Sequence, residues 1–195
     1  MIPSNLAEKM EERFTYGQYC QWDDGERWEL IDGVPYNMTP APLRRHQDIS
    51  TVVLSRIADF LRGKPCKVYH APFDVRFADC DEQEDENVST VVQPDLAVIC
   101  DEKKLDDRGC RGAPDLVVEI LSPSTSRKDI GVKFSLYERH GVREYWIIHP
   151  AEESLMIFNL GGDNRYGRPQ GYGRGDIATS KVLEGFELNV EEVFG

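Results

Sequence analysis

Hydrophobic positions along the chain recur with two different periods, which predict helices and strands. In residues 42–62 the apolar side chains stand three and four positions apart, which is typical of an amphipathic helix, and Gly63 follows as its end. Residues 129–140 show the same period and end before another glycine, Gly141. Short apolar runs bounded by turn residues predict strands at residues 27–31, 34–38, 67–70, 73–77, 91–100, 115–121, 143–149 and 155–160.

Turn and cap signals complete this outline. The dipeptide Asp32-Gly33 favours a two-residue hairpin turn, because both residues tolerate the positive φ that such turns require. Thr15 with Gln18 three positions later resembles a capping box and predicts a short helix that follows it, over residues 16–22. A last helical turn is predicted at residues 189–193 and a solvated loop at residues 79–86. The glycine-rich stretch 161–175 is predicted to be a long loop or a loose hairpin.

The size and composition of the chain agree with one globular domain, residues 1–195. The chain is 40% hydrophobic, which is too rich for disorder, and no stretch approaches the roughly 20 consecutive apolar residues of a membrane helix. Residues 1–13 lack the apolar core of a signal peptide, so we expect a cytoplasmic location. The order of elements predicts an α/β (α+β) fold, with a mixed central sheet flanked by helices.

Net charge and cysteine content exclude some classes of function and site. The net charge of −12 at pH 7 argues against a protein that coats nucleic acid by bulk electrostatics, so a polyanionic substrate has to be met locally. The five cysteines contain no C-x-x-C pair, which gives neither zinc-ligand spacing nor a complete disulfide framework. We therefore expect reduced thiols at Cys20, Cys66, Cys80, Cys100 and Cys110.

Two predicted strands contain an acidic residue within an apolar run. Residues 116–121 are apolar on both faces apart from Glu119, and Asp95 opens the apolar run of residues 95–99. A buried carboxylate needs a cation, a hydrogen-bond partner or a proton. If the two strands are neighbours, Asp95 and Glu119 lie about 5 Å apart, a distance that suits a shared Mg²⁺ or Mn²⁺ ion. The alternative is that each acid caps a backbone group or pairs with an arginine.

A lysine and a third acid complete the candidate cluster. Lys133 stands near the centre of the apolar arc of the predicted helix 129–140, so we expect it to face inward, either toward buried acids or along a stem that reaches solvent. Glu29 shares a strand face with Ile31, although an exposed strand glutamate is the more common outcome. His46 is expected to be an ordinary core or helix-surface histidine.

Several longer motifs resemble a known family. They are Trp28-Glu29-Leu30-Ile31-Asp32-Gly33, Ala71-Pro72-Phe73-Asp74-Val75-Arg76, Gln93-Pro94-Asp95, Gly112-Ala113-Pro114-Asp115-Leu116-Val117-Val118-Glu119-Ile120-Leu121-Ser122-Pro123-Ser124-Thr125, and Glu144-Tyr145-Trp146. With Lys133 and Tyr137 they resemble the Uma-type family of proposed restriction endonucleases, within the PD-(D/E)XK nuclease superfamily. The resemblance covers about the whole chain and implies a restriction-endonuclease-like core.

The resemblance also implies an activity. It places a Mg²⁺ or Mn²⁺ ion on Asp95 and Glu119, with Glu29 as an extra acid, and DNA phosphodiester hydrolysis as the reaction. The superfamily pattern has a lysine two residues after the second acid, but this chain has Leu121 there. The resemblance instead assigns the catalytic lysine to the next helix, as Lys133. A homodimer is implied as well.

Two other readings stay open. A member of the family that has no catalytic activity would be a binding or assembly module, which the net charge of −12 favours because it repels phosphates. A metal-dependent hydrolase of small phosphate esters is the other alternative.

Overall fold

The computed structural model describes residues 12–38, 41–79, 84–122 and 129–195, and within them most strands belong to two six-stranded sheets. The first sheet has the strand order β2 (Val34–Asn37), β1 (Trp28–Ile31), β5 (Val91–Val92), β4 (Asp74–Arg76), β8 (Gly109–Arg111), β7 (Leu105–Asp106). The second has the order β12 (Gln170–Tyr172), β11 (Ser154–Asn159), β10 (Glu144–His149), β9 (Leu116–Ile120), β6 (Leu96–Ile99), β3 (Lys67–His70). A separate antiparallel pair joins β13 (Ile177–Thr179) to β14 (Glu187–Asn189).

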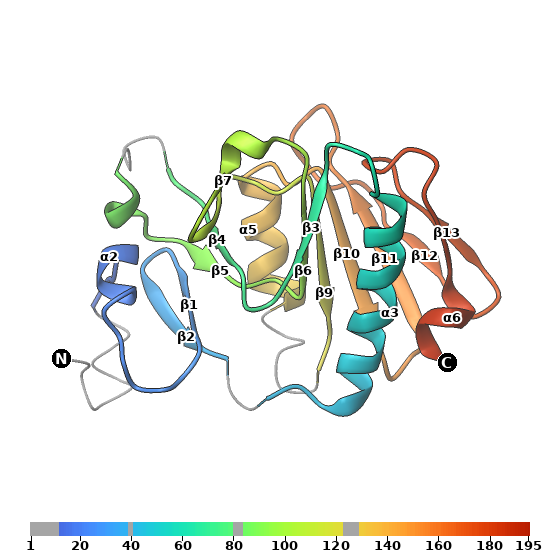
Figure 1. Ribbon diagram of the computed structural model, residues 1–195, viewed down its shortest axis with the longest axis horizontal. Coiled ribbons are helices and arrows are strands. Elements are labelled where there is room, and N and C mark those ends of the chain that lie inside the picture. Colours follow the sequence, from blue (N-terminus) through green and yellow to red (C-terminus); the bar gives the residue numbers. More distant parts are fainter. Residues whose placement is uncertain (1–11, 39–40, 80–83, 123–128) are drawn as a thin grey trace.

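Helices cover both faces of the second sheet (Figure 1). The long helix α3 (Arg44–Phe60) packs on one face together with the C-terminal segment, which ends in α6 (Val190–Phe194). The shorter α5 (Phe134–Arg139) packs on the other face, between the two sheets. The other short helices of the described residues are α2 (Tyr16–Tyr19), the 3₁₀ turns η1 (Asp85–Asn87) and η2 (Glu102–Lys104), and the π-helical turn η3 (Asp129–Lys133).

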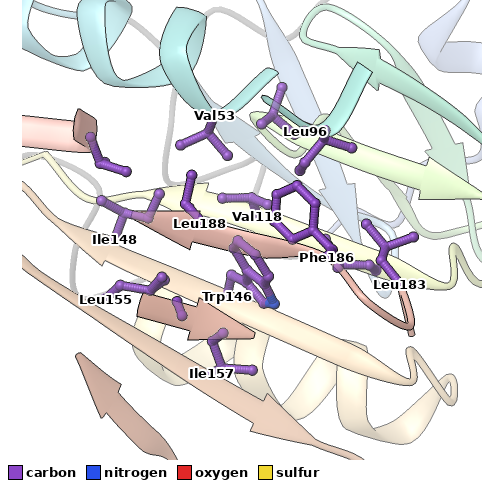
Figure 2. Close-up of a cluster of buried hydrophobic side chains, with 14 of the residues drawn as sticks. Val53, Leu96, Val118, Trp146, Ile148, Leu155, Ile157, Leu183, Phe186 and Leu188 are labelled. Carbon is purple, nitrogen blue, oxygen red and sulfur yellow. The ribbon is translucent and has the colours of Figure 1, made fainter. Parts of the chain in front are cut away.

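The larger core fills the space between α3, the second sheet and the C-terminal segment. Figure 2 shows how Val53 from α3, Val118 and Trp146 from the sheet, and Phe186 and Leu188 from the C-terminal segment converge. The rings of Trp146 and Phe186 lie 6.1 Å apart. Side chains that alternate along β9 and β10 face either this core or a second one around α5, which is why both strands read as continuous apolar runs.

The centre of the second sheet determines where the acidic residues lie. Strand β9 pairs antiparallel with β6 and parallel with β10. Since Leu96 pairs with Val118, one further step of the same register sets Asp95 opposite Glu119. The hypothesis of a paired acid site required the strands of Asp95 and Glu119 to be neighbours. This condition is confirmed.

The mixed α/β fold is confirmed, but its strands form two sheets where the sequence predicted one central sheet. The predicted strand 91–100 is in fact two strands, because β5 belongs to the first sheet and β6 to the second. Gln93-Pro94-Asp95 is the crossing between them, and Pro94 has no N–H to continue a ladder. Pro94 was therefore a sequence signal for this break, although it does not show which sheet each half joins.

Other differences are local. The predicted helix 129–140 begins as the π-helical turn η3, and strands β7, β8, β13 and β14 were not predicted. Strand β12 lies inside the irregular stretch predicted at residues 161–175 and pairs with β11. The expectation of reduced thiols was wrong for Cys66 and Cys100, which form a disulfide. They stand one step beyond the Lys67–Ile99 pair of β3 and β6, and sequence spacing does not show that register.

Cys80 and residues 1–11 lie outside the described part of the chain. Within the described part, no helix is both long and apolar enough to cross a bilayer.

Buried Glu144 ties the C-terminal segment to the second sheet. Its carboxylate is fully buried, accepts the indole N–H of Trp146 at 2.7 Å, and accepts the backbone N–H groups of Lys181 at 2.7 Å and Val182 at 3.1 Å. Removal of this acceptor leaves three donors without it, namely the buried indole N–H and two part-buried backbone N–H groups.

We predict that Glu144→Ala lowers the free energy of unfolding by about 3 kcal/mol, because buried donors lose their acceptor. Urea denaturation followed by circular dichroism measures the change. The control Glu187→Ala alters an exposed carboxylate on β14 and should change the free energy of unfolding by less than about 0.5 kcal/mol. An equal change in the free energy of unfolding for Glu144→Ala and Glu187→Ala would contradict this role of the Glu144 carboxylate.

Candidate active site

A buried ion cluster lies on the α5 face of the second sheet, and Lys133 is its centre. The ammonium group of Lys133 lies 2.7 Å from Oε1 of Glu119 and 2.9 Å from Oε1 of Glu29. The three residues are between 0% and 3% exposed. The inward orientation predicted for Lys133 is confirmed, and the alternative of an exposed glutamate is excluded for Glu29.

Each member of the cluster comes from a different element. Glu119 projects from β9, Glu29 from β1 of the first sheet, and Lys133 from the last position of the π-helical turn η3. Single π-helical turns are frequent at functional sites in proteins. The ion pairs of this cluster therefore link the two sheets, in addition to the apolar packing between them.

Tyr137 is a further partner that the sequence analysis did not assign a role. Its hydroxyl donates a 2.6 Å hydrogen bond to Oε1 of Glu119, the same oxygen that contacts Lys133. Burial, and secondly the negative charge of Glu119, raise the pKa of Tyr137 well above its ordinary value. Tyr137 therefore keeps its proton and remains a hydrogen-bond donor to Glu119 at neutral pH. The spacing of four residues from Lys133 on one helical path was the signal that could have identified it.

Gln93 links Glu29 to a second polar network. Its backbone N–H donates to Oε1 of Glu29 at 2.9 Å, and its side-chain amide donates to Asp74 at 2.8 Å and to the Tyr19 hydroxyl at 3.1 Å. Arg27 donates to the amide oxygen of Gln93 at 2.7 Å. Burial raises the pKa of the Asp74 carboxyl above its usual value. The crossing at Gln93 thus holds the carboxylate of Glu29 and links it to Asp74 and Tyr19.

Asp95 lies at the start of β6, beside the end of β9, and its contacts differ from those of Glu119. Its Oδ2 atom accepts the backbone N–H of Ile120 at 2.7 Å and lies 3.2 Å from Nε2 of His46, on the first turns of α3. The side chain of Asp95 is 19% exposed, so this carboxylate is more open to solvent than Glu119. His46 was expected to be an ordinary core or helix-surface histidine. It instead contacts Asp95, a candidate site residue.

The donor chemistry fits a hard divalent cation on two of the three predicted acids. Oxygen atoms of Asp95 and Glu119 are the ligand type that Mg²⁺ and Mn²⁺ prefer. Within the described residues, Oδ1 of Asp95 accepts no hydrogen bond. No group of three or more His, Cys, Asp or Glu side chains in the described part of the chain is arranged to hold a metal. Glu29 therefore does not complete a three-carboxylate ligand group here, and its Oε1 instead contacts Lys133 and Gln93.

Comparison with known structures finds the same fold in a solved protein. A crystal structure of a putative nuclease belonging to DUF820 from Anabaena variabilis superposes with a TM-score of 0.68 over 98% of both chains, at 18% sequence identity. The two proteins share the fold.

The sequence comparison gives the family itself. Residues 16–191 match the model of the Uma2 family, described as "Putative restriction endonuclease", and the chain belongs to that family. It is also 26% identical, over 149 residues, to the uncharacterized protein slr1290 of Synechocystis sp., a match that covers 75% of this chain and 74% of the relative. The resemblance inferred from the sequence motifs is confirmed.

We predict that Lys133→Met lowers the free energy of unfolding by about 3–5 kcal/mol at neutral pH, because it leaves two buried carboxylates without their cation. The added substitution Glu29→Gln removes one of these charges and should restore a large part of the loss. Denaturant titration of both single variants and the double variant measures the coupling. Additive losses in the double variant would show that the two side chains do not interact.

Proposed function

We propose that the chain is a metal-dependent nuclease that hydrolyses DNA phosphodiester bonds. The observation that supports this most strongly is the burial of Lys133 between Glu119 and Glu29, one strand away from Asp95. Burial of one cation with two carboxylates costs several kcal/mol of desolvation, so stability alone does not account for it. Membership of a family described as restriction endonucleases agrees with a catalytic use.

In this proposal Asp95 and Glu119 hold the metal. A bound Mg²⁺ or Mn²⁺ ion would supply Lewis-acid activation of the phosphate and a water of lowered pKa. The Ile120 N–H and His46 fix Oδ2 of Asp95 and leave its other oxygen for the ion. The hydroxyl of Tyr137 holds Oε1 of Glu119 in one orientation.

The roles of Lys133 and Glu29 follow from charge. Lys133 orients the attacking water or stabilises the negative charge that develops on the phosphate oxygens. Glu29 positions the ammonium group of Lys133 through a contact of 2.9 Å. This assignment replaces the expected role of Glu29 as a metal ligand with that of a positioning residue.

A binding or assembly module without catalysis is the second candidate. The net charge of −12 and the near-complete burial of Glu119 and Lys133 favour it, because substrate phosphates are repelled and the cluster is closed. Salt dependence separates the two, since binding through DNA phosphates weakens steeply as salt rises. Hydrolysis of a small chromogenic phosphodiester without plasmid nicking would indicate the third reading, a phosphoesterase.

We predict that the protein nicks supercoiled plasmid DNA in the presence of Mg²⁺ or Mn²⁺, and that Glu119→Gln and Asp95→Asn each reduce the nicking rate by at least about 100-fold. Both substitutions preserve the shape of the side chain but remove the ligand charge. Agarose-gel assays over time measure the rate, and circular dichroism checks the fold. The matched control is Glu102→Gln, which changes an exposed carboxylate in η2 and should leave the rate unchanged.

Nicking that persists in both Glu119→Gln and Asp95→Asn would contradict the assignment of the metal ligands. No nicking by the wild-type chain with either ion would contradict the nuclease function itself. The homodimer and the cytoplasmic location stay predictions, and light scattering coupled to gel filtration tests the first of them.

A further inference from the structure

A cavity of about 540 Å³ lies at the end of the second sheet where β9 and β10 finish and α3 begins. Its apolar walls include Leu43, Leu121 and Pro150, and its polar groups include Arg45, His46 and His149. Cavities of about 300–1,000 Å³ with apolar walls and a few polar groups are typical sites for small ligands. Neither the metal ligands nor Lys133 line it.

The cavity lies next to the candidate active site, because one of its lining residues contacts Asp95. His46 lines the cavity and also lies 3.2 Å from Oδ2 of Asp95. Leu121 follows Ile120, whose backbone N–H donates to the same oxygen. A group in this cavity is therefore separated from the proposed metal ligand by one side chain.

We propose that this cavity binds one unpaired nucleobase of a single-stranded DNA substrate, next to the phosphate that is cleaved. The inference rests on the proposed function and adds a substrate class to it. A nucleobase offers flat apolar faces to Leu43 and Leu121 and hydrogen-bonding edges to the two histidine rings. The adjoining backbone phosphate would then meet Arg45 at the rim.

Charge favours a base over a phosphate as the occupant of the cavity itself. Its walls are largely aliphatic, and an isolated phosphate would lose hydration there without enough donors to replace it. Arg45 is ion-paired with Glu153 at 2.6 Å, and the Arg45 side chain is 52% exposed, so solvent screens this pair and Arg45 can turn to a phosphate. The net charge of −12 also weakens the attraction of a polyanion, so the burial of a base contributes more to the binding free energy than the attraction of phosphates does.

The same geometry disfavours an intact duplex. Bases in a duplex are stacked and paired, and their entry into a cavity requires one nucleotide to leave the stack, at a cost of a few kcal/mol. An unpaired strand does not have this pairing to break. Leu43 is 68% exposed, and a base that packs on it would cover an apolar surface now open to solvent.

The test uses the full-length protein and two fluorescein-labelled probes, oligothymidylate and the same strand annealed to oligoadenylate. Binding is measured by fluorescence anisotropy in EDTA, so that metal-dependent cleavage does not interfere. We expect the single strand to bind at least about tenfold more tightly than the duplex. Leu43→Ala should weaken single-strand binding about fivefold, because it removes apolar wall without disturbing the core.

The matched control is Ile177→Ala, which truncates an aliphatic side chain on β13 that is 56% exposed and does not line the cavity. It should leave both affinities unchanged. Equal binding of the two probes, equal effects of Leu43→Ala and Ile177→Ala, or no binding of the single strand would each overturn the inference. Preference for the single strand that depends on Leu43 supports the inference even if plasmid nicking is absent, which keeps it distinguishable from the proposed function.

Discussion

The contact of one buried ammonium group with two buried carboxylates is the interaction on which the rest of the structure depends. Lys133 on η3 joins Glu119 in the second sheet to Glu29 in the first. Each group alone would be costly at this depth, and together they still carry an excess negative charge. The hydroxyl of Tyr137 and the backbone N–H of Gln93 also donate hydrogen bonds to these carboxylates and so help to compensate their burial.

The crossing at Gln93-Pro94-Asp95 explains why the acids lie where they do. The chain leaves the first sheet after β5 and enters the second at β6, so Gln93 faces Glu29 while Asp95 lies beside the end of β9. A single long strand would have placed these two residues on one ladder, with no route between the sheets. The crossing thereby brings an open carboxylate, Asp95, to the edge of a cluster that is otherwise closed.

Much of this could be predicted from residues close in sequence. The apolar runs located most strands, and the period of residues 129–140 gave the inward orientation of Lys133 because its neighbours on the arc are apolar. The family resemblance rested on long motifs and was confirmed. The division into two sheets was not predictable, since β5 and β6 carry the same apolar signal and differ only in their distant partners. The contacts of His46 and Tyr137 were missed for the same reason, because they depend on which elements pack together.

The account requires that Asp95 and Glu119 act as one metal site although Glu29 does not join them. Calorimetric titration of Mn²⁺ into the wild-type chain and into Asp95→Asn tests this directly. The account predicts saturable uptake by the wild-type chain and its loss in the variant, with the fold unchanged. Uptake of equal strength in both proteins, or none in the wild-type chain, would contradict it.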